Sequence, residues 1–203
     1  MSFVDQYISD AVQILKTLDK GQIDKMIEIL VSLRQKRGRL FFIGVGGSAA
    51  NCSHAVNDFR KLVGIEAYSP VDNVAELTAR TNDEGWETVF STWLETSNLN
   101  FNDAVFVLSV GGGSEEKNIS ANIVKALKYA QRQKAKILGI VGRDGGYTRH
   151  VADACLLIPT VNPNTITPHT EGFQAVLWHL IAADPRLMQI KNKWESVTIG
   201  HSI

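Results

Sequence analysis

The chain has 203 residues, of which 44% are hydrophobic, and its charge is balanced, with 21 Lys and Arg against 21 Asp and Glu. That length suits one domain with a sizeable core. The lack of a basic excess and of a long apolar stretch argues against nucleic-acid binding and a membrane span. Two widely separated cysteines and an N-terminus without signal-peptide features predict a cytoplasmic protein.

The first 37 residues predict two amphipathic helices. Apolar residues follow a helical stripe over residues 3–18 and again over residues 23–36. Gly21 is expected to break the first helix, and Gly38 to follow the end of the second. The two apolar faces need a partner surface, either the chain's own sheet or another subunit, and we favour a subunit interface.

A glycine-rich turn then links a predicted strand to a predicted helix. Residues 39–43 form a short apolar run typical of a buried strand, and the run after Gly-Val-Gly-Gly-Ser, residues 44–48, reads as a helix up to Gly64. Ser48 is expected to be its N-cap. Free backbone N–H groups and the helix dipole favour an anion here, although a tight connection without a ligand is the alternative.

This turn matches neither of two common nucleotide-binding patterns. It has no Lys after its last Gly, as a Walker A loop would, and Ala49 occupies the third Gly position of the dinucleotide fingerprint. A phosphorylated small molecule is therefore the favoured ligand.

The rest of the chain alternates strand and helix patterns. Short apolar runs predict strands at residues 66–68, 104–108, 137–141 and 154–158. Helical patterns cover residues 74–80, 86–94, 120–133, 169–183 and 188–194, and residues 81–85 have turn chemistry. This alternation predicts an α/β protein, a three-layer αβα sandwich with a mostly parallel sheet. Ligands of such folds sit at the carboxyl ends of the strands, where three strands here end in Gly-rich loops.

Two predicted helices carry residues suited to acid–base or metal chemistry. His54 and Asp58 are four residues apart on one helix face. Glu171 and His179 lie on the last long helix, roughly on one face. Two imidazoles and two carboxylates suit zinc or a similar divalent ion. Buried structural histidines and surface carboxylates are the alternative.

Residues 44–48, the helix that carries His54 and the loops at 109–114 and 142–146 resemble a sugar isomerase (SIS) domain. The most similar group is phosphoheptose isomerase, which converts sedoheptulose 7-phosphate to a heptose 7-phosphate. The resemblance extends from the N-terminal helices to His179. It implies a SIS or flavodoxin-like fold in a single domain, with N-terminal helices over 1–37, an αβα core over 38–184 and a C-terminal segment over 185–203.

The resemblance also implies specific site residues. In that family a His followed by Glu four residues later, and a Gln followed by His eight residues later, form a zinc site and the catalytic pair. The corresponding residues here are His54 and Asp58, and Glu171 and His179, so all four would hold the metal and the last three would act in catalysis. The implied substrate contacts are Val45, Gly46, Gly47, Ser48, Asp72, Asn73, Ser109, Val110, Gly111, Ser114 and Ser120.

Several of these positions depart from the family pattern. They are Val45 for Asn, Asp58 for Glu, Gly111 for Ser and Glu171 for Gln. An insertion around residues 115–118 lengthens the second loop, so either Ser114 or Ser120 can be its last phosphate-binding serine. The phosphate grip is retained, while the sugar-reading and proton-transfer positions have changed.

The function that follows is an aldose–ketose isomerase of a phosphorylated sugar that works through an enediol. The resemblance also implies a bound divalent ion such as zinc and a homotetrameric assembly. Asp58 or Glu171 would be the base, and His179 would protonate or polarise the oxygen. The alternative is a non-catalytic SIS-type module that binds a sugar phosphate or acts as an adaptor.

Overall fold

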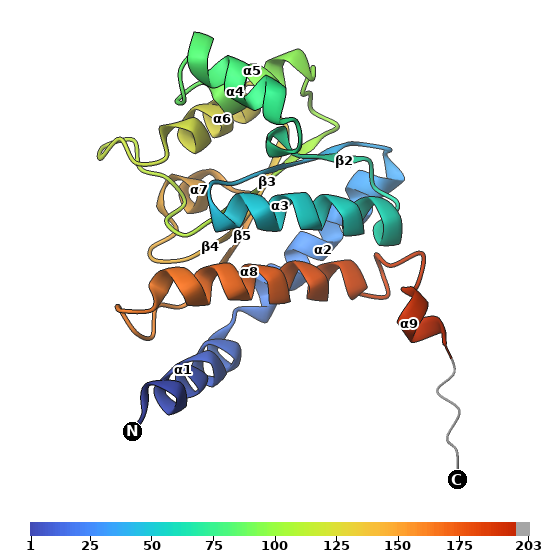
Figure 1. The fold of residues 1–203 in the computed structure, drawn as a ribbon. Coiled ribbons are helices and arrows are strands. Elements are labelled where there is room, and N and C mark those ends of the chain that lie inside the picture. Colours follow the sequence, from blue (N-terminus) through green and yellow to red (C-terminus); the bar gives the residue numbers. More distant parts are fainter. Residues whose placement is uncertain (198–203) are drawn as a thin grey trace.

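The computed structural model describes residues 1–197. At its centre is a five-stranded sheet in the order β2-β1-β3-β4-β5 (Figure 1). All its strand pairs are parallel, which confirms the predicted α/β class. The strands are β1 (Leu40–Ile43), β2 (Ala67–Tyr68), β3 (Ala104–Ser109), β4 (Lys136–Val141) and β5 (Ala154–Leu157).

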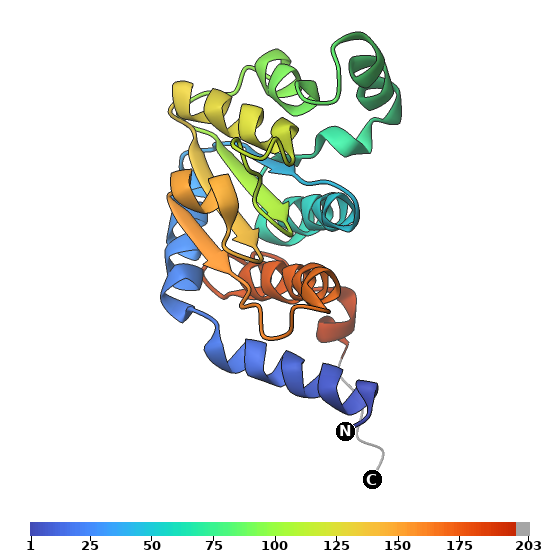
Figure 2. The ribbon, with the colours of Figure 1, turned by 90° about the vertical axis from the view of Figure 1, so that its left-hand side faces the viewer.

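Helices cover both faces of the sheet, as crossover connections between parallel strands require (Figure 2). One face carries α2 (Lys20–Gln35), α3 (Gly47–Asp58) and α8 (Ile166–Ala183). The other carries α5 (Val89–Thr96), α6 (Ala121–Arg132) and α7 (Gly146–Val151), with α4 (Val74–Asp83) packed outside α5. The result is the predicted three-layer sandwich.

Alternation along the strands divides the core between these two layers. Phe42 and Phe106 are fully buried toward α3 and α8, and their rings stack at 5.1 Å. Their neighbours Phe41 and Val105 are buried toward α5 and α6. Because successive side chains of a strand point to opposite faces, each four- to six-residue apolar run supplies both cores.

The chain leaves α3 through a π-helical turn, Phe59–Val63, which ends at Gly64 with a φ of +72°. A 3-10 turn, Pro70–Asp72, follows β2. Asn73 then caps α4, since its side chain accepts a hydrogen bond from the backbone N–H of Glu76. Among residues 1–197, no helix has the length and apolar character that would let it cross a bilayer.

Several predicted boundaries were wrong for local reasons. Gly21 does not break the first helix; α1 (Phe3–Thr17) ends earlier, and Asp19 caps α2 by accepting from the backbone N–H of Gln22 at 3.2 Å. Helix α4 continues through Asp83, so the expected turn over 81–85 begins only at Glu84.

Other helices also differ in position. Helix α5 starts at Val89, leaving Trp86 ahead of it. Helix α8 starts at Ile166, before Pro168, because proline is tolerated in the first turn of a helix. The short helix α7 was not predicted, and the C-terminal helix is reduced to α9 (Lys193–Ser196).

The two N-terminal helices have different surroundings. The apolar face of α2, including Met26 and Leu30, is buried in the chain's own core, so it is not left for a partner. Helix α1 instead extends away from the sheet beside the start of α8 (Figures 1 and 2). It buries only Asp10 and Ile14, while Phe3 and Ile8 stay 73% and 58% exposed.

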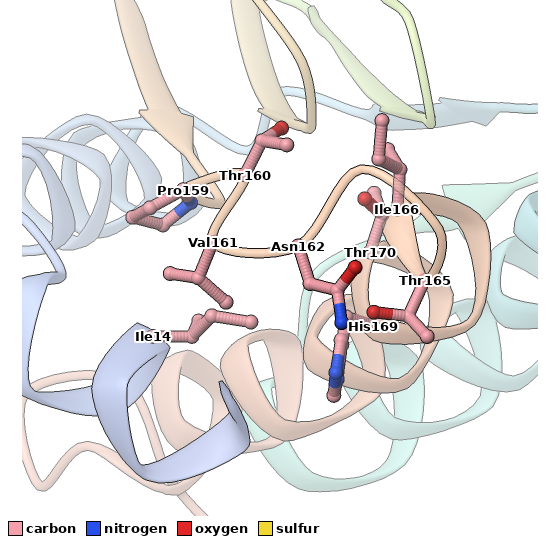
Figure 3. Close-up of a pocket in the computed structure, with 9 residues that line it drawn as sticks. All are labelled: Ile14, Pro159, Thr160, Val161, Asn162, Thr165, Ile166, His169 and Thr170. Atoms are coloured by element: carbon pink, nitrogen blue, oxygen red, sulfur yellow. The ribbon is translucent and has the colours of Figure 1, made fainter. Parts of the chain in front are cut away.

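A small polar junction attaches α1 to the core. Figure 3 shows the loop after β5 curving over the first turn of α8, with Asn162, Thr165 and His169 around a cavity that Ile14 closes. The cavity is about 10 Å³, enough for one water. The buried Asp10 carboxylate accepts hydrogen bonds from Gln6 at 2.7 Å and Asn162 at 2.9 Å.

Candidate active site

The site is built on the parallel pair α3 and α8, which lie side by side on one face of the sheet (Figures 1 and 2). Helix α3 begins directly after β1, at the carboxyl edge of the sheet, with Gly46 at φ +65° as its N-cap. Ser48 is therefore not the N-cap, as the sequence had suggested. It lies inside the first turn, where its side chain is buried and its Oγ has no hydrogen-bond partner among the described residues.

A hollow of about 630 Å³ opens at this edge, between the loops that follow β1, β3 and β4. Many predicted substrate contacts line it: Val45, Ser109, Val110, Gly111, Ser114 and Ser120. Parallel strands bring their carboxyl ends to one edge, which is why loops distant in sequence meet here. Of the serines expected to bind phosphate, Ser109, Ser114 and Ser120 line this hollow and Ser48 does not.

The insertion in the second loop is closed on itself. Ser114 and Ile119 form an isolated antiparallel bridge through two backbone hydrogen bonds of 2.8 and 3.0 Å. This bridge closes residues 115–118 into a small loop, and Ser114 and Ser120 on either side of that loop line the same hollow. The sequence alone left a choice between these two serines, and both line the hollow.

Some predicted substrate contacts lie elsewhere. Asp72 accepts a hydrogen bond from Ser53 on the side of α3, at 2.5 Å. Asn73 is engaged as the cap of α4. Gly46, Gly47 and Ser48 are at the start of α3 but are not part of the hollow's lining.

A second cluster lies further along α3 and α8. His54, Asp58 and His179 bring one ligand atom each to within 4.8 Å of one another. The Oδ2 atom of Asp58 is 3.6 Å from Nε2 of His179, and the two imidazole rings are 5.2 Å apart. Asp58 is buried, whereas both histidines are exposed, so the cluster is open to solvent on one side.

Hydrogen bonds fix the orientation of two of these groups. Nδ1 of His179 lies 2.7 Å from the carbonyl oxygen of Ala175. Because a carbonyl oxygen only accepts, Nδ1 donates there, and Nε2 is the ring nitrogen that faces Asp58. The other carboxylate oxygen of Asp58 accepts from Asn57 at 2.8 Å. Two imidazoles and one carboxylate, of which His179 and Asp58 are held by such outer contacts, are a donor set that fits zinc and leaves a coordination position open.

Glu171 is not part of this cluster. It lies two turns earlier on α8, where a Cβ added to Gly47 would be 2.5 Å from its Oε2 atom. Its carboxylate therefore lies against the first turn of α3, where the helix dipole favours negative charge. Asn51 holds this part of α8 by donating to the Glu171 carbonyl at 2.9 Å and to Gln174 at 3.1 Å.

Sequence reasoning missed other residues around both sites. Arg143, Tyr147 and His150 line the large hollow. A further hollow of about 420 Å³ opens beside Asp58 and His179, and Lys191 and Glu195 of the C-terminal segment line its other side. Arg143 lies in the loop at 142–146 that resembles the SIS family, but that resemblance gave its side chain no role. The other residues carry no motif, and only the folded chain brings them to the site.

Comparison with known proteins places this geometry in a family. The sequence model of the SIS domain matches residues 6–142. The chain belongs to the SIS domain family. A phosphoheptose isomerase of Akkermansia muciniphila is 32% identical over 154 residues, covering 72% of this chain and 76% of that protein. One of Helicobacter pylori is 26% identical over 164 residues, covering 78% and 80%.

A solved structure supports the same fold. The phosphoheptose isomerase GmhA of Neisseria gonorrhoeae superposes with a TM-score of 0.76 at 22% identity, over 88% of this chain and 94% of that one. At that identity the similarity concerns the fold alone.

Proposed function

We propose that this SIS protein is an aldose–ketose isomerase that interconverts sedoheptulose 7-phosphate and a heptose 7-phosphate through an enediol. The observation that carries the proposal is the convergence of His54, Asp58 and His179 on α3 and α8, together with the serine-lined hollow that Val45 borders just before α3. Its relatives in Akkermansia and Helicobacter bear the name of this activity.

Proton transfer is assigned to the residues of the cluster. Asp58 would remove the proton from the carbon next to the carbonyl, since its carboxylate faces the open side of His179. Nε2 of His179 would then exchange a proton with the substrate oxygen. Glu171 remains the alternative base, because its carboxylate lies at the start of α3, closer to the phosphate-binding loops.

A divalent ion, zinc in this proposal, would be held by His54, Asp58 and His179. When bound, it would stabilise the negative charge of the enediolate. The fit rests on the oriented Nε2 of His179 and on the buried Asp58 carboxylate. Glu171 would join the ligand set only if its side chain moved away from Gly47.

We also propose a cytoplasmic homotetramer. The exposed apolar stripe of α1 supports association, and two α8 residues, Val176 and Leu180, are also 48% and 45% exposed. A folded monomer seldom leaves so much large apolar surface in water.

The test is to incubate the purified protein with sedoheptulose 7-phosphate in deuterated buffer. An enediol mechanism predicts formation of the aldose phosphate and deuterium at the exchanged carbon, both visible by NMR. A protein that binds the sugar phosphate without turnover or exchange would instead support the alternative of a sugar-phosphate-binding or adaptor module.

A further inference from the structure

Unusual backbone conformations gather around the large hollow. Six non-glycine residues among the described ones have a positive φ. Three of them, Arg37, Asn98 and Lys134, follow the ends of α2, α5 and α6, where left-handed residues commonly terminate helices. The other three are Asn118, Ser120 and Arg143, with φ values of 48°, 51° and 54°, on the two loops that border the hollow.

The positive φ of Arg143 is unfavourable because of its Cβ atom. Such a conformation persists only where the surrounding structure holds it. Here the β4–α7 turn is held by the backbone of Gly142, which donates to the carbonyls of Ser109 and Val110 at 3.3 and 3.1 Å. The turn directs the Arg143 side chain into the lining of the hollow.

Within the hollow, Arg143 covers Gly111. Its Cδ atom is 3.7 Å from where a Cβ of residue 111 would be, an ordinary van der Waals contact. Gly111 is the position at which the resemblance to the family leads one to expect a serine hydroxyl. The aliphatic part of Arg143 therefore lies over the place of the missing hydroxyl, among Ser109, Ser114 and Ser120.

The charges of the lining leave this guanidinium available. The serines and backbone N–H groups are neutral, the cationic side chains of the lining are Lys117 and Arg143, and its carboxylates are Glu115, Glu116 and Asp144. Asp144 accepts a hydrogen bond from the backbone N–H of Gly146 at 3.2 Å. Glu115 forms an ion pair with Lys128. No acidic partner within 4.0 Å is found for Arg143 in residues 1–197.

We propose that Arg143 binds the phosphate of the substrate and replaces the hydroxyl absent at Gly111. This inference rests on the proposed function. A guanidinium can donate two parallel hydrogen bonds to phosphate oxygens, which a neutral serine cannot match in strength. Arg143 is preferred to Lys117, which lies on the inserted segment beyond the bridge between Ser114 and Ile119.

The test compares steady-state kinetics of the wild type with Arg143→Ala, Arg143→Lys and Arg149→Ala. Arg149 is the matched control, because its guanidinium donates to the carbonyl of Asp144 at 3.4 Å and it does not line the hollow. Arg143→Ala is expected to raise KM for sedoheptulose 7-phosphate by about 10- to 100-fold with kcat changed by less than about threefold. Arg143→Lys should have a KM between those of the wild type and Arg143→Ala, since lysine keeps the positive charge but cannot donate the two parallel hydrogen bonds of a guanidinium.

An unchanged KM in Arg143→Ala would overturn the inference, and so would an equal loss of affinity for unphosphorylated sedoheptulose, measured by calorimetry. If Arg143→Ala fails to fold, Arg143→Lys carries the test. If the wild type binds the sugar phosphate but does not isomerise it, the proposed function fails. The role of Arg143 is then tested by comparing the binding affinities of the wild type and Arg143→Ala for the sugar phosphate. If the wild type binds no sugar phosphate, both the proposed function and the proposed role of Arg143 are contradicted.

Discussion

Asp58 and His179 face each other across two helices, with Oδ2 of Asp58 3.6 Å from Nε2 of His179. Asp58 ends α3 and His179 lies in the last third of α8, so 121 positions of sequence separate them. Their approach depends on how the two helices pack on the sheet. A divalent ion or a proton between them would offset the cost of placing a buried carboxylate here.

The first prediction concerns this pair. His179→Gln keeps the size of a polar side chain but removes the imidazole, so we expect kcat/KM for sedoheptulose 7-phosphate to fall by at least about 10²-fold. Zinc content measured by plasma mass spectrometry should fall with it. Lys193→Gln, on the exposed helix α9, is the control, and it should change neither value. Normal turnover in His179→Gln would show that the cluster is not the catalytic centre.

The second prediction uses two glycines with different neighbours. In Gly47→Ala the new Cβ meets only the end of the flexible Glu171 side chain, so the free energy of unfolding should change by less than about 1 kcal/mol. In Gly112→Ala the Cβ would overlap the carbonyl oxygen of Gly145 at a residue with φ +70°, so a loss of at least about 2 kcal/mol is expected. Urea denaturation measures both.

The Gly47→Ala variant, compared with Glu171→Gln, also tests the role of Glu171. Gly47→Ala must displace its carboxylate, so activity should follow that of Glu171→Gln if this carboxylate takes part in the reaction. Full activity in both variants, with stable proteins, would leave Asp58 as the proposed base and remove Glu171 from the mechanism.

The sequence was sufficient for the fold class and its layers. The run Leu40–Ile43 is apolar at every position because both faces of β1 are covered, and the same holds for Ala104–Ser109. Continuous apolar runs between helical patterns are typical of parallel sheets. The three layers could therefore be predicted, although the order of the strands could not. Ser109 could also be placed at the carboxyl edge of the sheet, since it is the last residue of β3.

The position of Glu171 could not be predicted in the same way. The resemblance to the family implied a site shared with His179, but the Glu171 side chain lies where the absence of a Cβ at Gly47 leaves space. Arg143 was also missed, because a left-handed φ and a contact with Gly111 are tertiary features. Ser48 resembled an N-cap, yet the N-cap is Gly46 and the helix therefore begins two residues earlier than expected, at Gly47.

The third prediction concerns pH and the attachment of α1. Hydrogen bonds from Asn162 and then Gln6 hold the pKa of Asp10 below its ordinary value, and the facing His169 acts in the same direction. A carboxylate with a lowered folded-state pKa contributes stability above its unfolded pKa of about 3.9, and this contribution is lost as pH falls through the folded value.

We therefore expect α1 to detach in acid below about pH 4. Hydrogen exchange of the amides in Phe3–Thr17 should accelerate there, before the amides of β3 do. Asp10→Asn should weaken the attachment at neutral pH and remove most of this pH dependence. Equal protection of α1 at pH 3 and pH 7 in the wild type would contradict the assignment.

The last prediction concerns assembly through α1. Phe3, Ile8 and Leu15 are 73%, 58% and 49% exposed, on a helix joined to the core by little more than Asp10 and Ile14. An interface that buries this stripe would stabilise both the helix and the assembly. Wild-type protein at micromolar concentration should run as a tetramer in light scattering. Ile8→Glu should shift it toward smaller species, because a charge is costly to bury there. Lys16→Glu, a charge change at the end of the same helix, should leave the tetramer intact. A wild-type monomer, or an Ile8→Glu tetramer of unchanged stability, would exclude α1 as the interface.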